Sequence, residues 1–491
     1  MKNWKKIAAL LVVLVVFVAA FIFLNSQRGT PPTDTTSPSA TASGEEVKLV
    51  GIPQDAMAKI ILKRPDGEIV LTYEEREIEK LNEKDDGTTE KVKEKVKVWV
   101  NPSFDVDSSV VEDIALSGEM ATSKRLIDEN PQDDTIYGLD KAMITTFVSN
   151  EGKQVSIEVG DATPTGDANY VRIVGETKVY TLDSYRSETL QYGKYDIMSK
   201  NLYGTEAITP QDITSLALIK GGEKVFEGKR LTDVTDWMVT YPLERKADAS
   251  DITKPLQWIP AMRASEFLAE GTPDLKAYGL NNPKYVLDYT LAGKTYSLKL
   301  GNLEDSKYYA MMEGDTRVFK LDASSMNFLD LPAIDLMDTF VYIPMIYDVE
   351  KLVIELDGRV DELLINANQE DKTKEEFHLN GKKIEGDDNA SLFKRYYQGA
   401  IAIQGDKLDL GAVPTGEAFI KLTYTMKEAN PDKVVVVELI PTNDGYGYYL
   451  VVNNQYTGMA MGKRQLDKTD MGIRQAYINL MEGLSKTTDS E

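Results

Sequence analysis

The chain has 491 residues with 56 basic and 79 acidic side chains, a net charge of −23, no cysteine and one histidine, His378. These counts exclude disulfides, thiol nucleophiles, zinc–thiolate sites and motifs that need two histidines. The acidic balance also argues against nucleic acid as a partner, because phosphates repel such a surface. We expect no cofactor and no metal site, and the sequence offers no set of catalytic residues.

The N-terminus predicts a membrane anchor. Residues 7–24 are 18 consecutive apolar residues, which as a helix span roughly 27 Å, close to the thickness of a bilayer core. Because basic residues precede this run, the positive-inside rule places the tip in the cytoplasm and the bulk of the chain outside the cell membrane. The flanking residues of this single-pass anchor are Lys2, Trp4, Lys5 and Lys6. A cleaved signal peptide and a buried soluble helix remain the alternatives.

Five further segments follow the anchor, which with its tip occupies residues 1–27. Residues 28–46 are rich in Thr, Ser and Pro and have no apolar period, which predicts a flexible linker. The body after this linker divides into three stretches of similar length and a short tail. We assign them as repeat 1 at 47–208, repeat 2 at 209–345, a degenerate repeat 3 at 346–485 and a tail at 486–491.

Internal repetition supports this division. The block Tyr137-Gly138-Leu139 recurs 141 residues later as Tyr278-Gly279-Leu280. Two more blocks recur in the same order: 152–160 matches 293–301, and 175–183 matches 314–322. A third copy lacks this motif and is indicated mainly by aligned aromatic residues at Trp99, Trp237 and Phe377. The sequence therefore leaves open whether the chain contains two copies or three.

Each repeat begins with a predicted strand pair around a tight polar turn, at 58–71, 214–227 and 351–364. An aromatic strand and a capped helix follow, with Asp107-Ser108-Ser109 as the capping stretch in the first copy. Strands separated by glycine turns come next. A closing helical segment is expected after Asp183 or Ser184, and after Asp322 or Ser324. This order predicts an α+β fold of two to three tandem repeats, each mainly antiparallel sheet with short helices.

The segment Tyr73–Val98 is longer than its counterpart in the second copy and rich in Glu and Lys. Alternating Lys and Val at its end favours a strand. We interpret it as a lengthened, solvated hairpin, with a protruding arm that contacts a partner as the alternative.

Few residues point to chemistry. His378 is expected to be a surface or packing residue on the face opposite Phe377, because no nucleophile motif accompanies it. The acidic pairs lack the spacing of a calcium loop and are interpreted as solvated turns. Tyrosines at Tyr446, Tyr448 and Tyr449 are a speculative ligand contact, with ordinary core or edge-strand packing as the alternative.

The Tyr-Gly-Leu motif, the glycine-bounded strand pair after it and the block ending at Asp183 resemble the bacterial domain-of-unknown-function 4340 family. The similarity extends over residues 58–340 and, more weakly, over 346–485. Members of that family are membrane-anchored and often encoded beside ABC transporter subunits of the gliding-motility or auxiliary type. The resemblance implies an extracytoplasmic accessory to a membrane transport complex and carries over no catalytic residue.

These observations predict a non-enzymatic, membrane-anchored extracytoplasmic scaffold or accessory subunit of an ABC-type transport or envelope complex. Its expected partners are the bilayer, through residues 7–24, and a transporter permease or auxiliary subunit, but not nucleic acid. Repetition favours this hypothesis because copies spread a structural or binding role along a chain. An extracellular glycan- or ligand-binding module is the first alternative, and a carboxylate-based hydrolase is the second.

Overall fold

The computed structural model describes residues 46–84, 89–123, 125–204, 207–427, 431, 433–469 and 472–488. The predicted anchor, its flanking residues and nearly all of the linker lie outside these residues. Within the described part, no helix combines the length and the apolar character needed to cross a membrane.

The chain divides into two compact units. The first contains the described residues through Glu74 together with Trp99–Ile197. The second contains Glu75–Val98 and the described residues from Met198 onward. The boundary after Ile197 lies before the sequence-predicted end of repeat 1 at residue 208.

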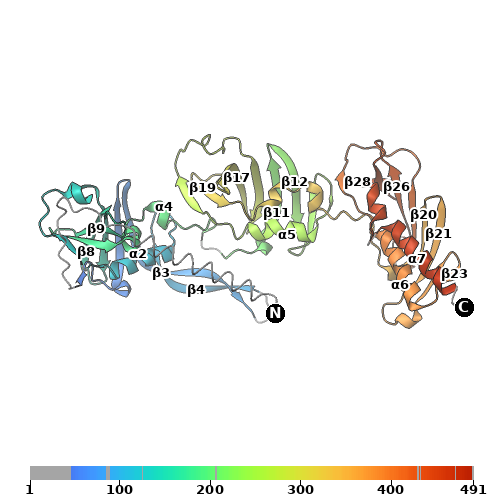
Figure 1. Cartoon of the computed structure of the whole chain (residues 1–491), viewed down its shortest axis with the longest axis horizontal. Helices are drawn as coiled ribbons and strands as arrows, with labels where there is room; N and C mark the ends of the chain where they lie inside the picture. Colours follow the sequence, from blue (N-terminus) through green and yellow to red (C-terminus); the bar gives the residue numbers. More distant parts are fainter. Residues whose placement is uncertain are drawn as a thin grey trace, which may run out of the picture. The chain divides into compact units, whose positions relative to one another are not determined.

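Three large sheets account for most of the strands (Figure 1). The first has the order β4-β3-β2-β7-β8-β9-β10-β6. Its strands are β2 (Met57–Arg64), β3 (Gly67–Glu83), β4 (Thr89–Val100), β6 (Leu126–Asp128), β7 (Met143–Ser149), β8 (Gln154–Ala162), β9 (Ala168–Ile173) and β10 (Val179–Asp183). A separate two-stranded sheet joins β1 (Val47–Lys48) and β5 (Thr122–Ser123).

The second sheet has the order β14-β13-β12-β11-β16-β17-β18-β19-β15. Its strands are β11 (Ile213–Lys220), β12 (Glu223–Arg230), β13 (Trp237–Tyr241), β14 (Arg245–Lys246), β15 (Glu266–Ala269), β16 (Tyr285–Leu291), β17 (Lys294–Glu304), β18 (Lys307–Met312) and β19 (Val318–Asp322). Apart from the extra edge strand β14, the strands follow the order of the first sheet, with β13 in the place of β4 and β15 in the place of β6.

The third sheet has the order β23-β22-β21-β20-β25-β26-β27-β28-β24, which matches the second strand for strand. Its strands are β20 (Val349–Leu356), β21 (Arg359–Asn366), β22 (Glu376–Leu379), β23 (Lys382–Lys383), β24 (Lys407–Leu408), β25 (Ile420–Met426), β26 (Val434–Pro441), β27 (Gly447–Val452) and β28 (Gln455–Gly462). Neighbouring strands pair antiparallel, as in β20 with β25 and β25 with β26. The predicted α+β class with mainly antiparallel sheets is confirmed.

Alternating side chains give each sheet one buried face. In β16, Tyr285, Leu287 and Tyr289 are buried while the residues between them are partly exposed. This period of two is what a strand shows when one face packs on a core and the other meets solvent. The third opening hairpin turns at the predicted pair, since Asp357 and Gly358 both have positive φ, +54° and +76°, as a two-residue primed turn requires. The second turns at Gly221 and Gly222, also with positive φ. The turn predicted for the first at Asp66-Gly67 lies one residue earlier, at Pro65 and Asp66, because Gly67 already pairs with Arg64.

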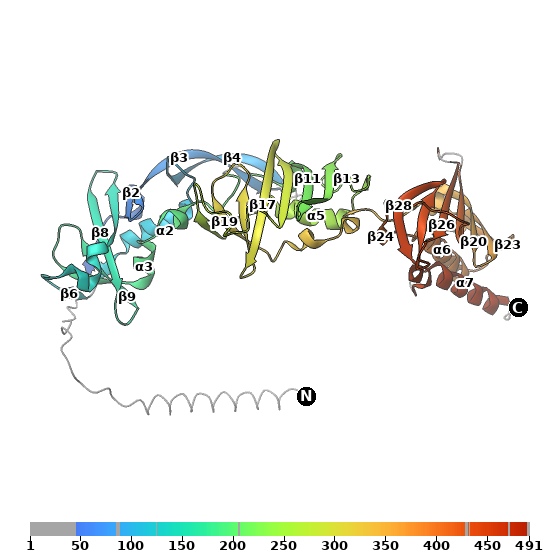
Figure 2. The same cartoon turned by 90° about the horizontal axis from the view of Figure 1, so that it is seen from above.

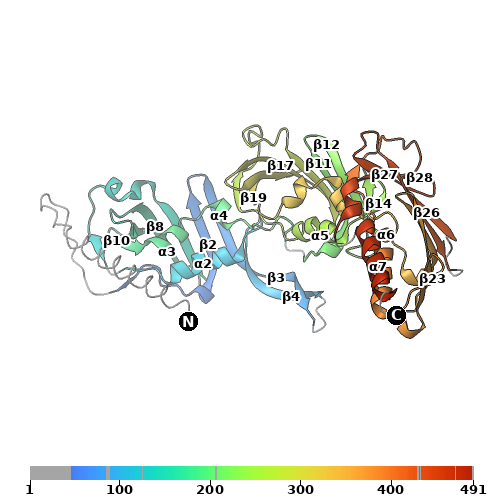
Figure 3. The ribbon, with the colours of Figure 1, turned by 45° about the vertical axis from the view of Figure 1, so that its right-hand side comes forward.

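A helix follows the aromatic strand in each sheet: α2 (Ser108–Glu119), α5 (Ala249–Trp258) and α6 (Asp387–Ile401). The cap of α2 lies in the predicted stretch and is Asp107, whose carboxylate accepts a hydrogen bond from the Ser109 amide at 3.2 Å. In the third sheet, α6 buries Phe393, Tyr396 and Ala400 in the core. Figure 3 shows the C-terminal helix α7 (Ile473–Thr488) beside α6.

One predicted cap is confirmed and one is wrong. Asp183 caps α3 (Ser184–Thr189) through the Arg186 amide, and α4 (Lys194–Ile197) follows. No helix begins at Asp322 or Ser324, because the Asp322 carboxylate closes only a local turn with the Ser324 amide. The next helical segments are the short 3-10 turns η5 (Asn327–Asp330) and η6 (Ala333–Leu336).

Candidate functional site

The Tyr-Gly-Leu loop of the first sheet is formed by two 3-10 turns that meet at a glycine. Turn η2 (Asp134–Tyr137) ends at Gly138, whose φ of +66° lies in the left-handed region, and η3 (Leu139–Lys141) starts directly after it. A Cβ on Gly138 would overlap the side chain of Asp161, and a Cβ on Gly160 in β8 would overlap the carbonyl oxygen of Tyr137. The loop therefore docks on β8 by backbone contact that two glycines permit.

The second sheet repeats this docking. Gly279 has φ +71°, and a Cβ on Gly301 in β17 would overlap the carbonyl oxygen of Tyr278. That carbonyl accepts a hydrogen bond of 2.9 Å from the Asn302 amide. The Tyr-Gly-Leu motif and the glycine that ends the next strand pair recur as separate sequence blocks. In the structure these two blocks contact each other.

Side chains of the motif pack in the same way in both copies. The ring centroids of Tyr137 and Tyr170 are 5.1 Å apart, and those of Tyr278 and Tyr309 are 5.2 Å apart. Leu139 packs with the buried Val179 in the first copy, and Leu280 packs with the buried Val318 in the second. In both copies these signature residues pack the loop against its sheet.

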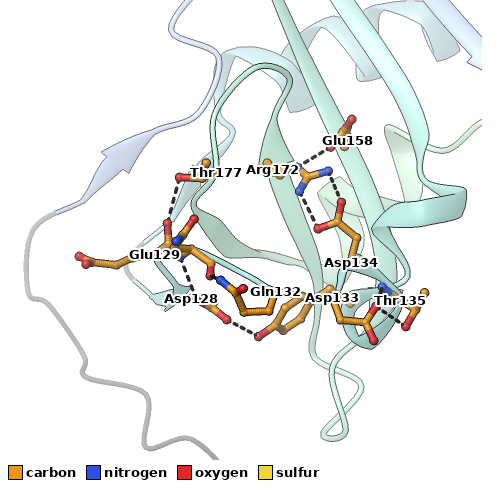
Figure 4. Close-up of polar contacts among 11 residues, drawn as sticks. Asp128, Glu129, Gln132, Asp133, Asp134, Thr135, Glu158, Arg172 and Thr177 are labelled. Atoms are coloured by element: carbon orange, nitrogen blue, oxygen red, sulfur yellow. Dashed lines mark hydrogen bonds and ion pairs between the residues drawn. The ribbon is translucent and has the colours of Figure 1, made fainter.

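Charged residues surround the loop of the first sheet (Figure 4). The Arg172 guanidinium donates to both oxygens of Asp134, at 2.8 and 3.0 Å, and to Glu158 at 2.7 Å. The hydrogen bond to Asp134 is the main reason why the pKa of Arg172 is raised. Arg172 thereby ties η2 to β8 and β9.

The remaining acids of this cluster also bind their own chain. Asp133 caps η2, and its hydrogen bonds from Thr135 lower the pKa of the Asp133 carboxyl. The Tyr137 hydroxyl donates a hydrogen bond of 3.0 Å to Asp128. The pKa of Tyr137 is raised mainly by burial and further by this hydrogen bond. Within the described residues, no group of three or more Asp, Glu or His is arranged to hold a metal ion. These hydrogen bonds and ion pairs hold the Tyr-Gly-Leu loop in place.

The aligned aromatic residues occupy equivalent strands. Trp99 in β4, Trp237 in β13 and Phe377 in β22 are all buried, and each of these strands follows the opening hairpin of its sheet. His378 lies next to Phe377 on the other face and is partly exposed, with its Nε2 3.4 Å from Glu376. Both placements agree with the alternation read from the sequence.

The three speculative tyrosine contacts do not form one surface. Tyr446 is 82% exposed, whereas Tyr448 and Tyr449 are 3% and 4% exposed. Tyr448 stacks on Phe419, and Tyr449 packs edge-on against Tyr456. The idea of a shared ligand contact is therefore wrong for two of the three residues, because β27 is covered on both faces.

Two features of the third sheet carried no sequence signal. Asp361 is 3% exposed and accepts hydrogen bonds from Arg359, Asn380 and Tyr396, which come from separate segments. A recess of about 530 Å³ beside α7 is lined by Leu379, Lys382, Ile384, Tyr477, Met481 and Leu484, among others. Tertiary packing alone brings these residues together, so no local spacing could have revealed them.

The fold and this site define a protein of repeated antiparallel sheets, two of which carry a loop that docks on its own sheet through glycines. A family model described as "Domain of unknown function (DUF4340)" matches residues 99–283 and, overlapping these, 237–391. The matches begin at the equivalent residues Trp99 and Trp237 and together span more than half of the chain. The chain belongs to this family. No curated protein and no solved structure matches it.

Proposed function

We propose that this protein is a non-enzymatic, membrane-anchored extracytoplasmic scaffold that serves as an accessory subunit of an ABC-type transport or envelope complex. Residues 7–24 are the anchor in this proposal, and 28–46 are the spacer between membrane and body. The body comprises three repeats, at 47–208, 209–345 and 346–485.

The observation that carries the proposal is the strand order common to the three sheets. Repeated units present similar surfaces along a chain, which suits a protein that binds or positions others. The signature residues support this view, since they are committed to packing the Tyr-Gly-Leu loops onto β8 and β17. The apolar run and the basic residues before it support the membrane location.

The partner is tested by isolating the full-length chain from detergent-solubilised membranes at its native level. Mass spectrometry should identify a permease, ATPase or auxiliary membrane subunit that is enriched over a mock purification. Deletion of the gene should also impair the transport or envelope property of that complex. Recovery of no membrane protein, together with an unchanged deletion strain, would contradict the proposal.

The location is tested with single cysteines, since the natural chain has none. In intact cells, a membrane-impermeant maleimide should label Glu151→Cys, at an exposed position, but should label Asn3→Cys only after lysis. The two variants control for each other. Labelling of both, or of Asn3→Cys alone, would show that the topology is wrong.

A further inference from the structure

The hairpin of β3 and β4 continues beyond its sheet as a two-stranded ribbon (Figure 2). β2 pairs with β3 over Gly67–Thr72, whereas β3 runs on to Glu83 and β4 starts at Thr89. The lengthened hairpin expected from the sequence is therefore present. We call residues 73–84 and 89–98 the arm.

Ion pairs between the two strands hold the arm. They join Glu77 to Lys93 at 3.0 Å, Glu75 to Lys95 at 3.8 Å, Lys80 to Glu94 at 2.6 Å and Lys84 to Glu90 at 2.7 Å. The pairs Glu75–Lys95 and Glu77–Lys93 show that the strands run antiparallel. All these side chains are exposed, so each pair contributes little and exchanges readily for another partner's charge.

The two faces of β4 differ because successive side chains of a strand alternate. Lys91, Lys93, Lys95 and Lys97 share one face and are all exposed, and Lys91 forms an ion pair of 3.4 Å with Asp212. On the other face Val92, Val96 and Val98 are half-buried, with the exposed Glu94 between Val92 and Val96. Beyond Glu94, β4 thus presents lysines on one side of its backbone and the two valines Val96 and Val98 on the other.

The outer edge of β4 is open among the residues that the structure describes, since β4 is the terminal strand of its sheet. In the other two sheets the equivalent strand has a further neighbour directly after the aromatic residue. There β14 pairs with β13 at Met238 and Val239, and β23 pairs with β22 at His378 and Leu379. An open edge presents unpaired backbone donors and acceptors, to which an extended segment can add.

We propose that the outer edge of β4 in the arm binds an extended segment of a partner protein, in which acidic residues alternate with apolar ones. In that arrangement the partner's carboxylates lie beside Lys93, Lys95 and Lys97, and its apolar side chains lie beside Val96 and Val98. Cross-strand pairs of opposite charge stabilise a sheet, whereas like charges destabilise it. The same lysine row disfavours a second copy of β4, because its lysines would lie against each other.

This inference rests on the scaffold role proposed above, for which it names a docking surface, and it is tested with the purified full-length chain in detergent. The probe is a fluorescent peptide of alternating Glu and Val, and the control peptide alternates Lys and Val. Fluorescence anisotropy should show binding of the Glu-Val peptide that weakens with added salt, and no binding of the Lys-Val peptide.

Matched variants locate the binding. The triple change Lys93→Gln, Lys95→Gln and Lys97→Gln should weaken binding about tenfold or more, since three cross-strand charge pairs are lost. The control Lys63→Gln, Lys153→Gln and Lys178→Gln removes the same charge from exposed sites outside the arm and should leave binding unchanged. The single variant Lys97→Gln, which touches none of the four ion pairs, should weaken binding even if the triple variant misfolds.

Equal binding of both peptides, absence of binding, or equal losses in the arm and control variants would overturn the inference. A chain that still recovers a membrane partner while ignoring the Glu-Val peptide would retain the scaffold function and lose only this docking surface.

Discussion

The first two sheets and the third reach the same strand order through different stabilising contacts. In the first two, a Tyr-Gly-Leu loop docks where the pairing register shifts, between Val159 and Ala162 in β8 and between Leu300 and Leu303 in β17. In the third, β26 pairs with β27 without such a shift, and there is no such motif. The glycine-docked loop and the bulge therefore occur together, and the strand order does not depend on them.

The third sheet has its own device at its C-terminal helix. α7 packs on α6 where Gly399 leaves room for the backbone of Ile473, since a Cβ on this glycine would lie 2.9 Å from Ile473 Cα. The Arg359 guanidinium stacks 3.7 Å from the ring centroid of Tyr477 in α7 and also binds the buried Asp361. The third sheet therefore has helix packing and a buried charged side chain where the first two sheets have a docked Tyr-Gly-Leu loop.

The largest effect should come from the feature that all three sheets share, the buried aromatic residue. Trp99→Ala, Trp237→Ala and Phe377→Ala should each lower the stability of their own sheet by about 3–5 kcal/mol, because each leaves a large cavity. Hydrogen exchange, read peptide by peptide with mass spectrometry, measures each sheet separately. Tyr446→Ala is the exposed control and should change little. If only one of the three substitutions lowers the stability of its sheet, the three aromatic positions are not equivalent.

The buried carboxylate specific to the third sheet should come next. Asp361→Ala should lower the stability of that sheet by about 2–3 kcal/mol, because Arg359, Asn380 and Tyr396 lose a charged acceptor. Faster exchange should appear in β20, β21 and α6, while the first sheet keeps its protection. Tyr396→Phe removes one donor only and should cost less. Exchange unchanged by Asp361→Ala would show that the network is dispensable.

The loop contact specific to the first two sheets should follow. Gly160→Ala should cost about 1–3 kcal/mol, because the added methyl overlaps the Tyr137 carbonyl oxygen and the loop must shift. The control Gly193→Ala places its methyl 3.8 Å from the nearest atom and should be nearly neutral. Exchange in residues 134–141 reads the loop directly. Equal protection in both variants would contradict the docking role.

Acid should loosen α7 by the smallest amount. Hydrogen bonds from Arg474 lower the pKa of Asp357. A carboxyl with a lowered pKa contributes stability above its unfolded pKa, about 4, and loses it as pH falls through the lower folded value. The effect should be no more than about 1 kcal/mol for so exposed a pair. Exchange of α7 between pH 6 and pH 3 should show it, and Asp357→Asn should abolish most of it.

Much of the fold was predictable because its determinants are local. Alternating apolar residues gave the strands, paired residues such as Asp357-Gly358 gave the hairpins, and Asp107 and Asp183 gave the caps. The wrong cap at Asp322 has a physical reason, since an Asx turn and a helix start share the same short-range hydrogen bond. Tyrosine clustering misled for Tyr448 and Tyr449, because residue type alone does not reveal that both faces of β27 are covered.

The sequence by itself determined the α+β class, the family, the two strong repeats and the composition that excludes cysteine chemistry. Each follows from patterns within a short stretch of chain or between similar stretches. Only the tertiary structure decided that Tyr137-Gly138-Leu139 docks on Gly160, that Asp361 is buried among three donors, and that β4 ends its sheet with an open lysine-bearing edge. Those contacts join residues far apart in the chain, and packing rather than local pattern selects them.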